Sequence, residues 1–184
     1  MLQLNLINFR KLVRGMTKEV NRRMVLSLLV DNTAGVLSRV AGLFSRRGYN
    51  IDSLTVGETE NPSISRMTVA ASGQEDVLEQ ITKQLGKLED VIEIVELERD
   101  SSVCRELLLV KVIANAEQRT QLNTIANIFR ANIVDVSSDI IMMELIGNTS
   151  KTDAFIKLLD GFEINELVRT GITGLTRGLT SKDD

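Results

Sequence analysis

One polar turn in the sequence has the residue types to bind a small anion. Residues 31–50 read DNTAGVLSRVAGLFSRRGYN, and the apolar spacing after the turn predicts a helix. A helix N-terminus attracts a carboxylate, because its first N–H groups are unpaired and its dipole end is positive. Gly35 suits a sharp turn or a close backbone approach to a ligand. No Lys or Arg lies between Asp31 and Ser38, so a zwitterion with one carboxylate fits this turn better than a phosphate.

Four residues around this turn are candidate contacts. Asn32 can donate or accept at the rim, or serve as a plain turn or helix-capping residue. Asn50 follows the helix at the start of the next strand; its amide can reach a ligand's charged group, or it is a turn residue with left-handed backbone. Val36 and Leu37 offer apolar contacts to a ligand, or belong to the core.

The composition argues against the common catalytic mechanisms. The chain of 184 residues has no histidine and one cysteine, Cys104, so histidine-based and zinc-cluster chemistry is unavailable. A net charge of −3, no Trp and one Tyr are unlike a nucleic-acid binder, and no apolar run is long enough to cross a membrane. The commonest catalytic tools are therefore missing, and we expect no catalytic residue, metal or cofactor in this chain. A lone thiol also fits a reducing compartment.

The same order of elements is predicted twice. A strand at 24–30, a helix from Val36 ended by Gly48, strands at 49–58 and 64–72, a helix over 77–88 and a strand at 91–98 form the first set. A strand at 106–114, a helix through Leu122–Phe129, strands at 132–138 and 139–147, a helix after a capping box at Ser150–Asp153, and a strand at 163–171 form the second.

The repeat of about 80 residues indicates tandem domains. The order strand-helix-strand-strand-helix-strand predicts an α+β fold of two ferredoxin-like domains. We place a basic extension at 1–21, the first domain at 22–99, the second at 103–178 and a tail at 179–184, with the boundary near Arg99–Ser102. The extension is rich in Arg and Lys, which is typical of an amphipathic partner contact or of a targeting peptide.

Both faces of the first strand are apolar, although two helices cover only one face of such a sheet. We therefore expect the sheets to join edge to edge or face to face in a homodimer or a higher oligomer.

A long stretch of the chain resembles a known family. VDNTAGVLSRVAGLFSRRGYNIDSLTVGETENPSISRMTV is similar to the N-terminal ACT domain of small regulatory subunits of acetolactate synthase. CRELLLVKV, IFRANIVDVSS, SKTDAFIKLL and RTGITGLTRG resemble the C-terminal domain of that family, in the same order. The likeness covers about residues 22–178.

The resemblance implies a non-catalytic subunit that binds and activates a large catalytic subunit and confers feedback inhibition by valine. Thiamine diphosphate, Mg and FAD are then expected on the large subunit, and a cytoplasmic location is expected, with the plastid as the alternative. By motif position, the effector site at an ACT-domain interface comprises Asn32, Ala34, Gly35, Val36, Leu37, Asn50 and Ile51, contributed by opposite subunits. Thr33-Ala34 replaces a more polar pair, so backbone contacts are expected there.

The second domain lacks a matching turn. Its counterpart, ANAEQRTQL, has Glu117 where a carboxylate would meet the helix, so we expect a structural or partner-contact role. A free-standing amino-acid sensor is the main alternative, because the turn fits it equally well. An RNA-binding module would need aromatic residues on its central strands, which are absent. A small acyl- or phosphoryl-transfer enzyme is disfavoured by the missing histidine.

Overall fold

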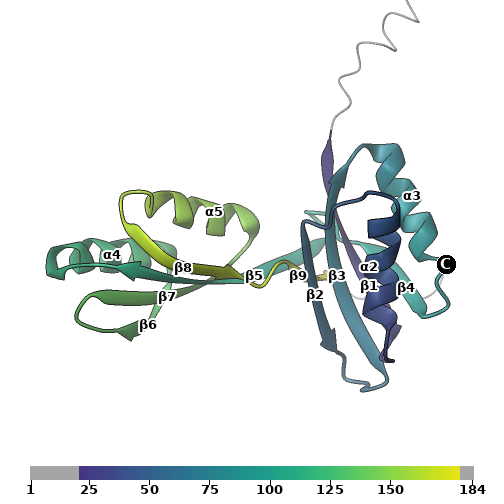
Figure 1. The fold of residues 1–184 in the computed structure, drawn as a ribbon, viewed down its shortest axis with the longest axis horizontal. Coiled ribbons are helices and arrows are strands. Elements are labelled where there is room, and N and C mark those ends of the chain that lie inside the picture. Colours follow the sequence, from purple (N-terminus) through teal and green to yellow (C-terminus); the bar gives the residue numbers. More distant parts are fainter. Residues whose placement is uncertain (1–20, 179–184) are drawn as a thin grey trace, which may run out of the picture.

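The computed structural model describes residues 21–178. The predicted extension, apart from Asn21, and the predicted tail lie outside the described residues. Two antiparallel sheets, one in each half of the chain, are joined through a long strand that leaves the first domain and enters the second (Figure 1).

The first sheet has the strand order β2-β3-β1-β4. Its strands are β1 (Arg22–Asp31), β2 (Ser53–Glu58), β3 (Ile64–Gly73) and β4 (Val91–Glu96). Two helices, α2 (Val36–Arg46) and α3 (Glu75–Leu85), cover one face of it. Gly48, with φ 70°, follows α2, which confirms the predicted helix stop. β2 begins at Ser53 and not at Tyr49, so Asn50 precedes the strand.

The second sheet repeats this arrangement with the order β6-β7-β5-β8. The strands are β5 (Ser102–Ile113), β6 (Asn132–Val136), β7 (Ile140–Gly147) and β8 (Glu163–Arg169), and the helices are α4 (Ala116–Phe129) and α5 (Thr149–Leu158). Both domains therefore have the predicted α+β, ferredoxin-like order, which confirms the fold class. Among residues 21–178, no helix is long and apolar enough to cross a membrane.

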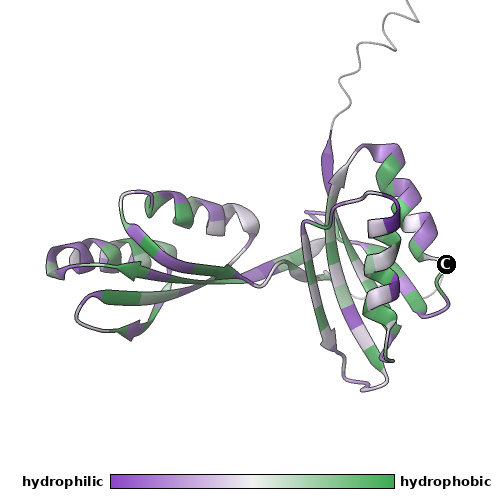
Figure 2. Cartoon of the chain, viewed as in Figure 1, coloured by the Kyte–Doolittle hydropathy of each residue, from purple (hydrophilic) through white to green (hydrophobic). Residues whose placement is uncertain are grey.

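Each domain has its own core between its sheet and its helices. In the first, alternate residues of β1 point to the helices and are buried together with Phe44 of α2. In the second, buried Phe155 of α5 meets Phe129 of α4 edge to face, with ring centroids 5.3 Å apart. The helices keep polar residues outside and apolar residues toward the sheets (Figure 2).

One strand was not predicted. β9 (Thr173–Thr176) pairs with the first four residues of β5, Ser102 to Arg105. β5 therefore starts four residues earlier than predicted. Gly174 permits this pairing, because a Cβ there would lie 2.7 Å from Cys104 Sγ.

The segment before β9 covers part of the outer face of the first sheet. Ile172, 5% exposed, accepts a hydrogen bond from Thr55 Oγ1 at 2.9 Å and donates its N–H to Ser53 Oγ at 3.2 Å. Thr55 and Ser53 pair with Thr68 and Ala70, both buried although they face away from the helices. The chain itself thus covers part of the apolar sheet face that was expected to be buried in an oligomer.

The predicted capping box at Ser150–Asp153 was wrong. α5 begins at Thr149, and Asn148 is its N-cap, accepting from the N–H of Lys151 at 2.9 Å. Asp153 instead pairs with Arg169 at 2.8 Å. Asn148 lies closer to the end of β7, so the short connection selects it as the cap.

Candidate functional site

The turn between β1 and α2 is fixed from both sides. At its start, Asp31 donates its N–H to the carbonyl of Asp90, which precedes β4, at 2.9 Å. Asn32 donates its backbone N–H to Ser63 O at 2.8 Å, and its side-chain amide donates to Pro62 O at 2.8 Å and to Glu58 at 3.1 Å. The Asn32 side chain therefore ties the turn to the β2–β3 hairpin.

Gly35 is the N-cap of α2 and has φ 91°. This left-handed conformation is strained for a residue with a side chain. No side chain caps α2, and its first turn contains no acidic residue. The first-turn N–H groups of Leu37 and Ser38 have no acceptor within the helix and face the exposed turn. They form the anion-attracting end that the sequence predicted.

The structure brings only part of the predicted site together. Asn32, Ala34 and Gly35 are exposed in the turn, and Leu37 is 45% exposed at the helix start. Val36 is buried in the core at 2% exposure, so its side chain does not face the turn, contrary to one of the two alternatives for it.

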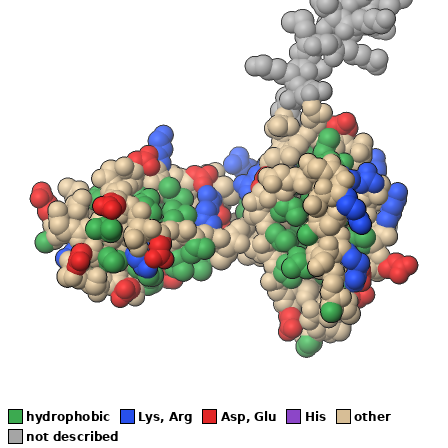
Figure 3. Space-filling view, in the orientation of Figure 1, with side chains coloured by type: hydrophobic (Ala, Val, Ile, Leu, Met, Phe, Trp, Pro, Cys, Tyr) green, Lys and Arg blue, Asp and Glu red, His purple; other side chains and the backbone are tan. Residues whose placement is uncertain are grey.

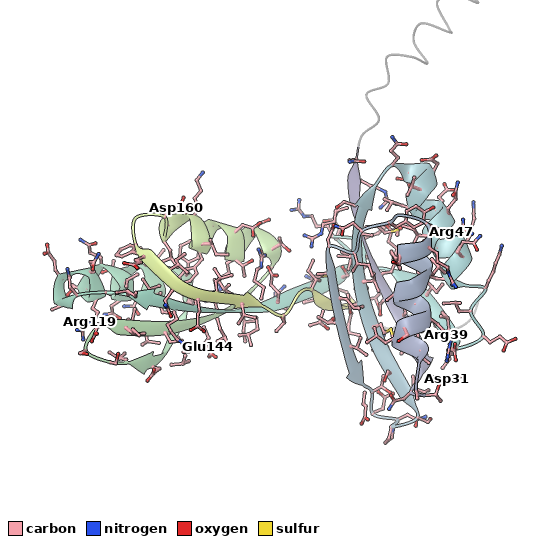
Figure 4. All side chains as sticks on the ribbon, viewed as in Figure 1. Asp31, Arg39, Arg47, Arg119, Glu144 and Asp160 are labelled. Atoms are coloured by element: carbon pink, nitrogen blue, oxygen red, sulfur yellow. The ribbon has the colours of Figure 1, made fainter. Side chains whose placement is uncertain are left out.

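The other two predicted residues lie at the opposite end of α2. Asn50 is exposed and close to Asp52, with 3.5 Å between the side-chain N and O, and Ile51 packs partly against the core. An 11-residue helix is about 16 Å long, so these residues are far from Gly35 in the same chain. Figure 4 shows the same separation, with Asp31 and Arg39 toward one end of α2 and Arg47 at the other. A site that uses both groups needs two copies.

Arg39 of α2 contacts the turn, and sequence reasoning missed it. Its guanidinium lies beside Gly35, where a Cβ would be 3.0 Å from Nη1. It forms a two-pronged ion pair with Asp90, both contacts at 2.6 Å. The sequence does allow this contact to be predicted, because helical side chains point toward the helix N-terminus and Arg39 lies four residues after Gly35.

The Arg39–Asp90 pair shifts both groups toward their charged forms. The hydrogen bonds from Arg39 hold the pKa of Asp90 below its usual value, and those to Asp90 raise the pKa of Arg39. The Arg39 side chain is 46% exposed and the Asp90 side chain 20%, so water screens the pair in part. Because Arg39 is already paired, an incoming carboxylate would meet backbone N–H groups before a free cation.

The equivalent helix of the second domain has no open end. Asn115 caps α4 by accepting from the N–H of Gln118 at 2.9 Å, and Gln118 returns a bond to the Asn115 N–H at 3.0 Å. Glu117 adds a negative charge in the first turn. This capping box favours the prediction that the second domain has no anion site at its first helix.

Comparisons with known proteins agree with this architecture. A family model described as the AHAS small subunit-like ACT domain matches residues 26–93, and one described as the small subunit of acetolactate synthase matches residues 105–178. The chain is 54% identical to a probable acetolactate synthase small subunit of Methanothermobacter thermautotrophicus, over 84% of this chain and 92% of the relative.

Two further matches extend the likeness across species and to a solved structure. The small subunit of acetolactate synthase isozyme 3 of Salmonella typhimurium is 48% identical over 85% of this chain and 96% of its own length. The crystal structure of the acetolactate synthase small subunit from Thermotoga maritima is 39% identical, with a TM-score of 0.79, and covers 86% of this chain and 99% of its own. With both domains matched in order, the chain belongs to the family of acetolactate synthase small subunits.

Proposed function

We propose that this chain regulates acetolactate synthase by binding valine, or a related branched-chain amino acid, between two copies of its first domain. It binds the large catalytic subunit, raises its activity and transmits feedback inhibition. Catalysis, with thiamine diphosphate, Mg and FAD, belongs to the large subunit. The family relationship supports the partnership, and the open N-terminus of α2 supports the ligand class.

The observation that carries the effector site is the uncapped start of α2 next to a left-handed glycine. The effector carboxylate accepts hydrogen bonds from the first-turn N–H groups, where the helix dipole favours a negative charge. The exposed side chain of Leu37 contacts the effector's branched side chain. Because Asn50 and Ile51 lie at the far end of α2, the ammonium group meets these residues of the second copy.

A route from this site to the second domain exists in the chain. Ser53, three residues after Asn50, accepts from the N–H of Ile172, and Thr55 donates to its carbonyl. A shift of residues 50–52 on effector binding therefore acts directly on the segment that leads into β9. An effector changes activity only by its difference in affinity for two arrangements, and typical couplings are about 1–3 kcal/mol.

Replacing Gly35 by Asp tests the effector site. An aspartate puts a side chain against Arg39 and a negative charge where the effector carboxylate binds. We expect calorimetric valine binding and valine inhibition to be lost, while activation of the catalytic subunit persists. Gly178→Asp is the matched control, because Gly178 also has positive φ, 70°, and open space around it, and it follows β9, away from the proposed effector residues. It should keep full valine binding and inhibition. Full valine sensitivity of Gly35→Asp would rule out this site.

The partnership has its own test. The purified chain alone should show no condensation of pyruvate, and adding it to the large subunit should raise the rate. A chain that binds valine but neither binds nor activates the large subunit would instead be a free-standing sensor. Activity of the isolated chain would overturn the assignment as a non-catalytic subunit.

A further inference from the structure

A cleft at the junction of the two domains gathers arginine side chains. The start of β1, the end of β4, the start of β5 and the first turn of α5 form its walls. Its arginines are Arg22, Arg23, Arg99, Arg105 and Arg177. Its acids are Glu96 and Glu98. Five arginines less two glutamates give this lining a formal charge of +3, although the whole chain carries −3. Figure 3 shows basic side chains gathered at the narrow junction.

Much of this positive charge is not neutralised by the protein. Arg22 is paired with Glu75 and Glu96, and Arg23 lies 3.8 Å from Asp52. By contrast, neither Arg99 nor Arg177 forms an ion pair with any residue in 21–178. Arg105 donates from Nη1 to the neutral carbonyl of Cys104 at 2.8 Å. Within residues 21–178, three guanidinium groups thus border one cleft without a carboxylate partner.

The opposite wall supplies further donors. Asn148, Thr149 and Ser150, at the start of α5, line the same cleft. The Asn148 side chain caps only the N–H of Lys151. The N–H groups of Thr149 and Ser150 lie in the first turn, where the helix offers no acceptor. Residues with hydroxyl, first-turn amide and guanidinium donors therefore line one cleft, from elements of both domains.

This combination of donors points to a particular ligand chemistry. Guanidinium groups bind phosphate oxygens in pairs, and helix N-termini bind phosphate through N–H groups. A single carboxylate, as in valine, could form a two-pronged pair with only one of these three guanidinium groups. We propose that the junction cleft binds a small phosphate-bearing anion with at least two negative charges, such as a diphosphate group.

This site is separate from the proposed effector site. None of the seven predicted effector residues lines the cleft. The anion would contact the first domain through Arg99 and the second through Ser150 and Arg177, so its binding stiffens the junction. Anion binding at the junction does not depend on valine binding, and a separate titration tests it.

Calorimetric titration of the full chain with sodium diphosphate at low salt tests the proposal. We expect saturable binding with one site per chain, weakened by added NaCl because part of the cleft is open to solvent. The double variant Arg99→Gln/Arg177→Gln should bind at least about tenfold more weakly, because two charge-assisted contacts are lost. Arg99→Lys/Arg177→Lys should keep part of the affinity, since the charge remains but the planar fork is lost.

The control is Arg46→Gln/Arg47→Gln, which removes two exposed arginines without ion pairs at the far end of α2. It should bind diphosphate like the unmodified chain, and thermal unfolding should show that both double variants are folded. No binding at millimolar diphosphate, equal affinity for sulfate, or equal weakening in the control would overturn the proposal. The proposal would also be overturned if Arg99→Gln/Arg177→Gln kept its affinity for diphosphate but no longer bound the catalytic subunit. The cleft would then hold an acidic segment of that protein. ADP and free diphosphate as separate ligands distinguish a nucleotide from the bare phosphate group; tighter binding of either supports the proposal.

Discussion

The two domains share an order of elements but differ in how their helices begin. In the second domain, asparagine side chains cap both α4 and α5. In the first, α3 starts with Glu75 and Asp76, which suit the positive end of its dipole. Among the helices of residues 21–178, only α2 has neither a side-chain cap nor an acid in its first turn. A helix end that the fold leaves open is available to a ligand.

The domains also differ in where they place charge. In the second, Glu106 is 4% exposed and accepts from Arg169 and Thr152, while Arg169 also reaches Asp153. In the first, Arg39 and Asp90 form their pair at the surface. The second domain therefore uses charge to hold its interior, and the first uses it to position an exposed turn.

The largest expected effect is on the separate cores. Phe155→Ala and Phe44→Ala each remove a buried ring and should each cost about 3–5 kcal/mol. Each should act on its own domain, so hydrogen exchange should rise mainly in the domain that carries the substitution. An equal rise in both domains would show that they unfold as one unit.

Next in size is the loss of the interior ion pair. Arg169→Met leaves the buried Glu106 without its cation and should cost on the order of 3 kcal/mol. Chemical denaturation at neutral pH measures this cost. Adding Glu106→Gln should recover part of it, because the uncompensated charge is then gone. A loss no larger than that of an ordinary surface substitution would remove the distinction between the two domains.

The same cluster predicts a change in pH dependence. Burial raises the pKa of Glu106, but hydrogen bonds from Arg169 and Thr152 outweigh it, so the net pKa lies below its usual value. Stability from this group is thus present above the unfolded pKa and lost as pH falls through the lowered one. In Arg169→Met, burial, the hydrogen bond from Thr152 and the charge of Arg23 remain as influences on this pKa. Loss of the hydrogen bonds from Arg169 raises the pKa of Glu106 in the variant, so less of this group's stabilisation remains at neutral pH. The difference in stability between the two proteins should therefore grow as pH rises from 3 to 7, and chemical denaturation at a series of pH values measures it.

Removal of a helix cap should lower the free energy of unfolding by a smaller amount. Asn115→Ala and Asn148→Ala should each cost about 1 kcal/mol, because each leaves a first-turn N–H unpaired. Asn32→Ala is the counterpart in the first domain, and it should change valine affinity more than stability, since Asn32 ties the turn to the hairpin and caps nothing. Thermal unfolding and calorimetry separate the two outcomes.

The smallest effect on stability is expected at Arg39. Arg39→Gln breaks an exposed pair, so thermal unfolding should hardly change. The turn should nevertheless loosen, because Asp90 and Gly35 both contact this side chain, and valine binding should weaken. Unchanged valine affinity would mean that the turn is held by Asn32 and the Asp31–Asp90 backbone contact alone.

Local patterns were sufficient to predict most of the fold. Alternating and helical spacing identified eight strands and four helices, and Gly48 marked the end of α2. The errors lie where a distant partner decides the outcome. β9 is four residues long and forms a strand only because β5 runs past it, and α5 is capped by Asn148 in preference to the box expected after it.

The candidate site was predictable in part for the same reason. Gly35 and the turn around it follow from local backbone chemistry. The position of Arg39 could be predicted from the direction in which helical side chains point. The burial of Val36 depends on how α2 packs on its sheet. The junction cleft was not predictable, because its arginines come from four separate parts of the chain.

The contact of Ile172 with Ser53 and Thr55 has a consequence for synthesis on the ribosome. These partners are separated by 117 and 119 residues, so the first domain is translated long before the segment that covers its sheet. During that interval the nascent first domain exposes to solvent a sheet face that is covered in the complete protein. Such exposed surfaces promote association of incomplete chains. Messages truncated before codon 172 should therefore yield a less soluble product than the full one.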